Sequence, residues 1–489
     1  MKNILKSTLA VVLALSVMGC TKWLTIPTEA EQPTATIDYS DPTGAPGLLI
    51  GAYSLFGGAN AMGSWVQLGV LAVRGDDTEK GNSNPSDQAD LTNFHNFNYS
   101  TAASYWAIGS AWNGLFQNIA NMNESITALE TYKENGADAA TMDSYIGQIQ
   151  VLRDYLYFRL ARLFGPVPVF FKNADKTAQR QTYEHVMQAL VKDLKDAVEK
   201  LPAVKPSAAP YKGQVTKYSA YALAAKCAAE ILDYDTVLEM TQPIISAYGE
   251  TALFADFHNL FNVLGKNCDE SLIEVQYNLA GSPRASSDNY FAFQGVSHPF
   301  KDAAGNALSG GWGFLPPSEK LESFLKDRGE TVRYETSILK VGATTYGGDV
   351  IETGNAYPTM YSGKAYCPSN LMVDNARDYG SSNNIHIIRY ADILLLNAEA
   401  MVKKGQNGDQ PFNWVRKRAG MPNLTNVTFE QVMDERMAEL CLENGERYYD
   451  LARTGLAKTV LANYTDDVRF YPIPTSALDA NPALKEPAI

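Results

Sequence analysis

Cysteine and histidine are scarce in this chain. Its 489 residues include 5 cysteines and 5 histidines, and no Cys-x-x-Cys or His-x-x-x-His pair brings two of them close in sequence. No Gly-x-Ser-x-Gly motif or phosphate-cradling glycine loop is present either. The sequence therefore gives no support to metal, redox, serine-triad or nucleotide chemistry. Disulfide bonds among Cys227, Cys268, Cys367 and Cys441 are left open.

Positive charge is also in deficit. The chain has 41 Lys and Arg against 54 Asp and Glu, a formal net charge of −13. Nucleic-acid binding needs a basic patch that displaces counterions from phosphates, so we expect no nucleic-acid partner. Binding to an anionic lipid surface is disfavoured for the same reason. With 45% hydrophobic residues the chain is globular, and its 27 Tyr, 19 Phe and 6 Trp exceed what core packing obviously requires.

The chain has no long apolar run, and only a short one marks its N-terminus. Lys2 and Lys6 precede a short apolar run, Leu9 to Val17, which ends close to Gly19-Cys20. This run is too short to span a membrane. It is typical of a lipoprotein signal peptide that is cleaved before a lipidated cysteine, here Cys20. The alternative is an ordinary signal peptide with a chance cysteine.

The sequence therefore divides into three predicted segments. Residues 1–19 form the signal peptide, and residues 20–41, rich in Thr, Pro and Glu, form a lipidated tether. Residues 42–489 form a single domain. The mature chain is then expected to be anchored to a membrane without spanning it.

Helical periodicity dominates two parts of this domain. We expect helices over Gly47–Phe56, Trp65–Val73, Tyr105–Tyr132, 146–163, Tyr183–Leu201, Thr216–Leu232, Asp235–Tyr248 and Ile387–Ala400. The Gly165-Pro-Val-Pro168 sequence should end one of them, because proline removes a donor and fixes φ. The predicted fold is mostly α, a tetratricopeptide-like scaffold of helix pairs over about 42–250 and 385–489.

The segment from Asp434 to Gly455 predicts a further helix with one apolar stripe and one charged ladder. Glu439 and Glu443, four residues apart, could act as a catalytic acid and base. Arginines three and four residues away would instead keep them ionised. We therefore favour a structural ion-pair network, in which arginines of this segment also pair with Glu399.

Between about 251 and 384 the helical period fades, and Gly, Ser, Asn and Tyr become frequent. This region is predicted to be a loop-rich insertion with a few short strands, where binding sites usually lie. Trp312, flanked by glycines, is expected to face a ligand, the alternative being a buried plug. Tyr290 and Phe291 are placed in a polar loop that could complete an aromatic platform, or else in the core.

A polar stretch from Asp76 to Asp90 is expected to be a loop. Its acidic and amide side chains could hold a structural calcium ion, although they lack the spacing of a helix-loop-helix calcium site. The alternative is a solvated loop without metal. No other cofactor is expected.

Four stretches together resemble the SusD/RagB family, surface lipoproteins that accompany TonB-dependent outer-membrane transporters in Bacteroidetes. These stretches are Leu152–Pro168, Ile387–Ala400, Asp434–Gly455 and the ending with Arg469–Pro474 and Asn481-Pro482. The resemblance implies a non-enzymatic, lipid-anchored protein of the outer membrane that faces the cell exterior. Such a protein binds oligosaccharides and delivers them to a SusC-like transporter, against which its helices pack.

The resemblance also implies ligand contacts. The candidate ligand-binding residues are Trp312, Tyr290, Phe291, Trp65, Arg74, Asp77 and Phe94. Two other functions stay open. One is a RagB-like surface lipoprotein that binds peptides. The other is a secreted glycoside hydrolase with carboxylates from the middle region, for instance Asp302 or Glu319.

Overall fold

A computed structural model of the chain describes residues 37–58, 61–63, 65–68, 70–173, 179–277, 289–354, 357–371 and 383–489. The predicted signal peptide and the predicted lipidation site, Cys20, lie outside the described residues. Of the predicted tether, only residues 37–41 are described. None of the helices in the described part of the chain combines the length and apolar character that a membrane crossing requires.

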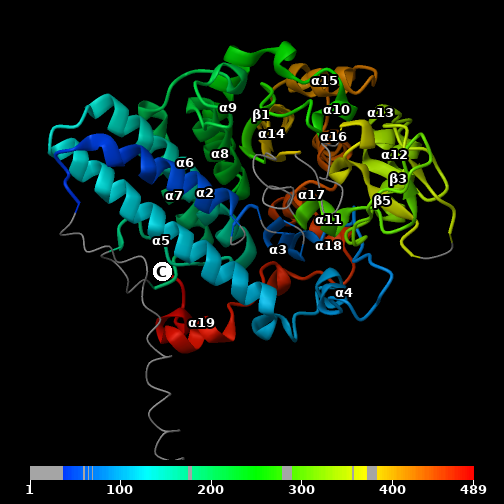
Figure 1. Cartoon of the computed structure of the whole chain (residues 1–489), viewed down its shortest axis with the longest axis horizontal. Coiled ribbons are helices and arrows are strands. Elements are labelled where there is room, and N and C mark those ends of the chain that lie inside the picture. Colours follow the sequence, from blue (N-terminus) through cyan, green and yellow to red (C-terminus); the bar gives the residue numbers. More distant parts are fainter. Residues whose placement is uncertain are drawn as a thin grey trace, which may run out of the picture.

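A layer of helix pairs forms one side of the molecule (Figure 1). Its helices are α2 (Ala45–Gly57), α5 (Trp106–Glu134), α6 (Ala139–Phe164), α7 (Tyr183–Lys200), α8 (Lys217–Glu230) and α9 (Tyr234–Tyr248). Successive helices from α5 to α9 pack against one another. The predicted helical-pair scaffold and the mostly α fold are confirmed.

The middle of the chain forms the opposite side of the molecule, with short helices and strands (Figure 1). Its helices are α10 (Phe257–Leu260), α11 (Asn289–Gln294), α12 (Glu319–Asp327) and α13 (Val332–Ser337). Its strands are β1 (Ser271–Val275), β2 (Phe300–Lys301), β3 (Ile338–Lys340), β4 (Val350–Ile351) and β5 (Met360–Ser362). Antiparallel pairs join β2 with β4 and β3 with β5. The few short strands were predicted, whereas these four helices were not.

Most of the C-terminal helices lie between the two sides, whereas the last one lies at the edge of the scaffold next to α5 (Figure 1). The C-terminal helices are α14 (Tyr390–Lys403), α15 (Asp409–Arg418), α16 (Phe429–Leu440), α17 (Glu446–Arg453), α18 (Ala457–Val460) and α19 (Thr475–Ala480). Two short helices, α3 (Trp65–Leu68) and α4 (Asp90–His95), lie between α2 and α5 in the sequence. Helix α14 packs on α8 and α9 of the scaffold and on α15 and α16, so it joins the two halves of the helical core.

Three predicted helices differ from those observed. The helix expected over Trp65–Val73 is shorter, because α3 ends at Leu68 and a 3-10 turn follows at Val70–Ala72. The start of the Ile387–Ala400 helix is a strand, β6 (Ile385–Arg389), which pairs antiparallel with β1. The Asp434–Gly455 segment is two helices, α16 and α17, because residues with positive φ interrupt it.

The predicted end of one scaffold helix is confirmed. Helix α6 ends at Phe164, and Gly165 follows with φ of 73°. Its N–H donates to the Ala161 carbonyl at 2.7 Å, and a Cβ at this position would lie 2.6 Å from the Phe470 ring. Glycine therefore fits both the left-handed turn and the close approach of the C-terminal segment.

Candidate functional site

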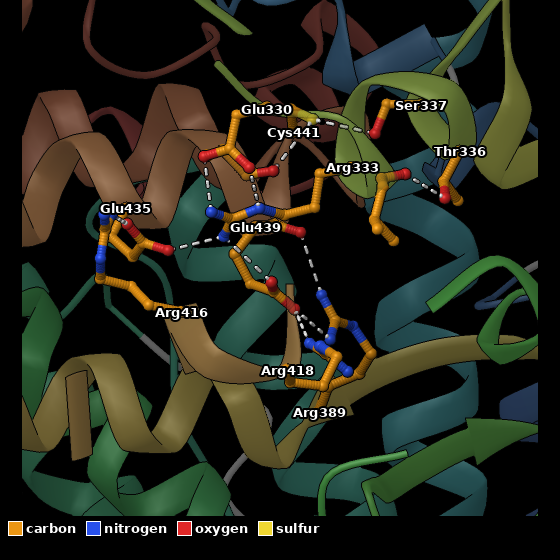
Figure 2. Close-up of polar contacts among 12 residues, drawn as sticks. Glu330, Arg333, Thr336, Ser337, Arg389, Arg416, Arg418, Glu435, Glu439 and Cys441 are labelled. Atoms are coloured by element: carbon orange, nitrogen blue, oxygen red, sulfur yellow. Dashed lines mark hydrogen bonds and ion pairs between the residues drawn. The ribbon is translucent and has the colours of Figure 1, made fainter. Parts of the chain in front are cut away.

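Glu439 lies inside a buried ion-pair network (Figure 2). Its carboxylate pairs with Arg389 at 2.9 Å, with Arg333 at 3.4 Å, and with Arg418. Neighbouring Glu443 pairs with Arg389 and Lys364, each at 2.7 Å. A carboxylate bound by several cations stays ionised and has no proton to shuttle. The predicted ion-pair network is confirmed, and the geometry does not favour a catalytic acid and base.

The partners in this network come from distant segments. Arg333 lies on α13, Arg389 at the end of β6, and Arg418 at the end of α15. The helical neighbours that the sequence suggested as partners bind elsewhere: Arg436 pairs with Asp392 and Asp450, and Arg447 pairs with Asp76. Arg447 lies beyond the break between α16 and α17, whereas Arg436 lies on α16 with Glu439 and still binds carboxylates of other segments.

The titration of Glu443 reflects this environment. Burial raises the pKa of its carboxyl, but Arg389 and Lys364 outweigh burial and lower the pKa to about 2. Burial also raises the pKa of Glu435 and of Glu270, and neighbouring arginines lower it. The arginines outweigh burial, so both pKa values are lowered. These carboxylates are therefore ionised at neutral pH.

A second buried chain of alternating charges connects the scaffold with the C-terminal helices. In order, its members are Glu230, Arg162, Glu446, Lys226, Asp392, Arg436, Asp450, Arg453 and Glu399. Arg453 binds both oxygens of Glu399, at 2.6 and 2.7 Å. The predicted pairing of Glu399 with an arginine of the 434–455 segment is confirmed.

Trp312 lies in a loop that is hydrogen-bonded along its backbone to α11 and the turn after it. The Trp312 N–H donates to the Ala292 carbonyl at 2.6 Å, and the Phe314 N–H donates to the Phe293 carbonyl at 2.9 Å. The half-buried Trp312 ring packs edge-to-face on Phe293, with ring centroids 6.3 Å apart. The loop thus holds one face of the ring while part of it stays accessible.

The glycines beside Trp312 serve packing. A Cβ on Gly311 would overlap the backbone of Gly295, and a Cβ on Gly313 would lie 2.6 Å from the Ser297 Oγ. Gly313 also has φ of 70°. The absence of side chains at these glycines lets the loop lie directly on the turn after α11.

The same loop pairs with the polar segment that follows α3. Asn82 N–H donates to the Gly313 carbonyl at 2.6 Å, and bridges join Gly81 with Phe314 and Thr78 with Pro317. We call this pairing of residues 78–82 with 313–317 the recognition seam. It fixes Trp312 and the polar segment in one rigid unit, although they are more than 200 residues apart in sequence.

Tyr357 stands beside the recognition seam and was not among the predicted site residues. Its side chain is 49% exposed. Burial and Glu79 raise the pKa of Tyr357, while a hydrogen bond with the Gly81 backbone lowers it, and the net shift is upward. The next residue, Pro358, approaches Gly313. The high tyrosine content was the only hint in the sequence, because nothing marks one exposed tyrosine among 27.

A groove of about 270 Å³ opens on the other part of the polar segment. Its polar lining includes Asp76, Glu79, His95, Asn96, Glu319 and Lys320. Asp76 is neutralised there by Arg447 and Lys320, each at 2.7 Å. Glu79 belongs to both the groove and the recognition seam. The groove therefore adjoins the seam that carries Trp312 and contacts Tyr357.

Tyr290 and Phe291 lie in helix α11 and are buried, with 8% and 5% exposure. Their placement in a polar loop is therefore wrong. Their rings pack edge-to-face on each other, 5.3 Å apart. Tyr290 and Asp77 line the same small pocket.

Arg74, Asp77 and Phe94 are buried as well. The Arg74 guanidinium lies 4.1 Å from the ring centroids of both Tyr448 and Tyr471 and donates to the Arg469 carbonyl at 3.1 Å. It therefore binds the N-terminal part of the chain to the C-terminal part. Asp77 accepts from the Leu442 N–H at 2.8 Å.

Phe94 has no exposed surface and packs edge-to-face on Tyr99, Tyr105 and Tyr471. In this structure its ring presents nothing to a ligand. Trp65 is the first residue of α3. Of the seven predicted ligand contacts, Trp312 is the one whose described side chain lies at the recognition seam with part of its surface accessible.

The polar segment from Asp76 to Asp90 gathers no metal ligands. Its acidic groups are used separately: Asp76 pairs with Arg447 and Lys320, and Asp87 accepts from Asn82 at 3.1 Å. Across the described residues, no group of three or more His, Cys, Asp or Glu side chains could hold a metal ion.

The two carboxylates suggested for a hydrolase have structural surroundings. Asp302 accepts from the N–H groups of Ala304 and Asn306 at 3.0 and 2.8 Å, which closes a tight turn. Glu319 is an exposed residue in the first turn of α12, where a negative charge is favourable. The cysteines of the described residues are free, with Cys227, Cys367 and Cys441 buried.

The structure thus combines a helix-pair scaffold with a loop-built surface that presents aromatic and polar side chains. The chain belongs to the SusD family: residues 269–469 match the family described as "SusD family". Residues 66–228 match a second SusD-like family, described as "Starch-binding associating with outer membrane". The two matches do not overlap and together cover well over half of the chain.

Individual relatives are similar at low identity. A SusD-like protein of Bacteroides ovatus is 23% identical over 373 residues, or 70% of this chain, which spans 65% of that relative's length. SusD-like protein P2 of Formosa agariphila is 25% identical over 425 residues, 80% of this chain and 79% of the relative.

Solved structures share the fold. Surface glycan-binding protein A from Bacteroides fluxus superposes with a TM-score of 0.75 at 24% identity, over 89% of this chain and 96% of that one. A laminarin-binding SusD-like protein has a TM-score of 0.75 at 22% identity, over 90% and 97%. Surface glycan-binding protein A from Bacteroides thetaiotaomicron, in complex with laminarihexaose, has a TM-score of 0.71 at 21% identity, over 89% and 97%.

Proposed function

We propose that this chain is a non-enzymatic binding protein for oligosaccharides at the outer surface of the outer membrane. A lipid on Cys20 anchors it, and bound glycan passes from it to a SusC-like TonB-dependent transporter. The observation that carries the proposal is the recognition seam. Its loop carries the part-exposed ring of Trp312, and the exposed Tyr357 hydrogen-bonds through its side chain to the Gly81 backbone of the same seam.

Such an arrangement suits sugars for physical reasons. Aromatic rings offer flat apolar faces for the C–H groups of a sugar, and a few fixed polar groups recognise its hydroxyls. The seam is held by backbone hydrogen bonds and stacking, with the Phe293 and Phe314 rings parallel and 4.5 Å apart. Little ordering is then required on binding, which reduces its entropic cost.

The relatives support the same class of ligand. One structural neighbour binds laminarin and another holds laminarihexaose, both neutral glucans. The family that matches residues 66–228 is described as starch-binding and associating with the outer membrane. These descriptions support an outer-membrane location and a glycan ligand, while the transporter and the lipid anchor rest on family resemblance and on the Gly19-Cys20 sequence.

The experiment measures binding and product formation together. The purified chain without its signal peptide is titrated with laminarihexaose, maltohexaose and cellohexaose, and the mixtures are analysed for shorter sugars. We expect binding without product. Trp312→Ala and Tyr357→Ala should each weaken binding about tenfold or more, equivalent to about 1.4 kcal/mol.

Two matched controls use exposed rings elsewhere. Trp106, 49% exposed at the start of α5, and Tyr211, 75% exposed between α7 and α8, should be replaceable by alanine without loss of affinity. Product formation would contradict the non-enzymatic function and favour a hydrolase. Binding of peptides but of no sugar would favour a RagB-like protein. The lipid anchor is tested separately, by palmitate labelling of cells that produce the protein. Labelling of the protein that persists after Cys20→Ser would contradict a lipid on Cys20.

A further inference from the structure

Ser297 is an exposed residue that lies against the Trp312 loop. A Cβ on Gly313 would lie 2.6 Å from the Ser297 Oγ, and a Cβ on Gly310 would lie 3.9 Å from the Ser297 Cα. Because Pro358 also approaches Gly313, three segments meet at this glycine. Ser297 therefore places a hydroxyl next to the recognition seam.

A chain of hydrogen bonds fixes this hydroxyl from the inside. The Ser297 Oγ lies 2.9 Å from the Tyr361 Oη, and the Tyr361 Oη lies 2.5 Å from the His298 Nδ1. Tyr361 and His298 are buried, with 1% and 6% exposure. These hydrogen bonds thus connect an exposed serine to two buried side chains, which are shielded from solvent.

Packing holds the two inner groups in place. Tyr361 lies in β5 opposite Leu339 of β3, and its ring packs on His298 with centroids 5.9 Å apart. The same apolar cluster includes Val296, Phe300 and Tyr366. A serine hydroxyl on an exposed turn ordinarily rotates freely, whereas here one of its hydrogen bonds is already committed.

We propose that Ser297 is a direct polar contact for the oligosaccharide, and that Tyr361 and His298 are positioning residues that orient its hydroxyl. This inference rests on the proposed function and names residues of the same site. A hydroxyl has one donor and two acceptor positions, so the bond to Tyr361 leaves capacity for a sugar hydroxyl. Fixing its direction removes the freedom that binding would otherwise have to freeze.

The test is a double-mutant cycle with laminarihexaose, or with maltohexaose if that is the sugar that binds. Ser297→Ala should weaken binding about 3- to 10-fold, the effect of one hydrogen bond. Tyr361→Phe should weaken it by a similar or smaller factor. In the Ser297→Ala background, Tyr361→Phe should cause no further loss, because its effect passes through Ser297.

If Tyr361 only stabilises the fold and does not orient Ser297, the affinities of the variants should follow a different pattern. The two single losses would then multiply in the double variant, which would overturn the positioning role. The matched control is Tyr366→Phe, which removes a buried hydroxyl from the same cluster, one that bonds Thr345 at 2.8 Å and also Asp349. It should leave affinity unchanged even if it lowers the melting temperature.

The failures of the two proposals can be told apart. If the unmodified chain binds, Trp312→Ala weakens binding and Ser297→Ala does not, the inference about Ser297 is overturned while the proposed function stands. If the unmodified chain binds none of the sugars, both are overturned. Circular dichroism and thermal melts of each variant establish that a loss of affinity is measured on folded protein.

Discussion

Gly311 shows how a single missing side chain can position a binding residue. A Cβ at this position would overlap the backbone of Gly295, which has no side-chain end that could move aside. We expect Gly311→Ala to push the Trp312 loop off the turn after α11. It should lower the free energy of unfolding by about 1–3 kcal/mol, as overpacking does, and weaken sugar binding along with it. Urea unfolding and a sugar titration measure the two effects.

Gly109 provides the control for this substitution. It lies inside α5, and a Cβ there meets no atom within 4 Å. Gly109→Ala should therefore be neutral or stabilising by up to about 1 kcal/mol, because alanine restricts the unfolded chain and favours helix. If both substitutions leave stability and binding unchanged, close packing of the loop does not position Trp312.

Residues were the scale at which prediction from sequence succeeded least. Trp312 could be singled out because its neighbours are glycines, yet the reason for these glycines is contact with Gly295 and Ser297, which no local pattern encodes. Arg74 is polar and was expected to face a ligand. Its burial between Tyr448 and Tyr471 depends on rings almost 400 residues away in the sequence. Ligand contact by Trp312 stays a prediction.

At the scale of elements, the turn between α16 and α17 decides which charges meet. The pKa of Glu443 in this turn is about 2 in the folded chain, below its ordinary value of 4.5. Between these two values the unfolded chain binds more protons than the folded one. The stabilisation by this group, about 3 kcal/mol, is therefore complete above pH 4.5 and is lost as the pH falls towards 2.

Several other buried carboxylates act in the same direction. The pKa values of Glu270, Glu435, Glu446 and Asp450 are also lowered by cations that outweigh burial. Burial raises the pKa of Asp154, which opposes this trend. We expect the denaturant midpoint to fall steeply below pH 4.5, and Glu443→Gln to be less stable at pH 7 with a shallower fall. Equal slopes for both proteins would contradict this account.

Element boundaries were predictable where a local cause acts. Gly165 and Pro166 end α6 as expected, because glycine and proline act on their own backbone. The break inside the 434–455 segment begins with Cys441 and Leu442, and neither is a glycine or a proline that would mark the end of a helix. Leu442 and Asn444 adopt φ of 63° and 51°, which side chains usually avoid. The contacts of Asp77 with Leu442 and of Arg159 with the Asn444 carbonyl accompany this conformation, and they come from distant segments.

For the whole molecule, helical periodicity and four spaced motifs were enough to predict a mostly helical SusD-like fold. The arrangement of the middle region could not be predicted in the same way. Its two-residue and three-residue strands carry too few residues to show a period, and its short helices were read as loops. The single domain over residues 42–489 stays a prediction.

The buried ion pairs make that prediction testable. Arg333, on α13 of the middle region, is fully buried and pairs with Glu330 at 2.6 Å and with Glu435 of α16 at 2.7 Å. Because this network joins the middle region to the C-terminal helices, and the second network joins those helices to the scaffold, we expect one cooperative unfolding transition by calorimetry. Arg333→Met leaves three buried carboxylates, those of Glu330, Glu435 and Glu439, without this partner. It should therefore reduce the free energy of unfolding by about 3–5 kcal/mol and lower the melting temperature of the whole transition.

Lys301→Met provides the control, because Lys301 belongs to the same region but forms an exposed pair with Glu352, 43% and 38% accessible. An exposed pair contributes at most about 1 kcal/mol to stability. The melting temperature of this variant should therefore be close to that of the unmodified chain. Two separable transitions in the unmodified chain would contradict a single domain. A transition that splits only in Arg333→Met would instead mean that the buried network, more than the apolar contacts between the regions, makes them unfold as one unit.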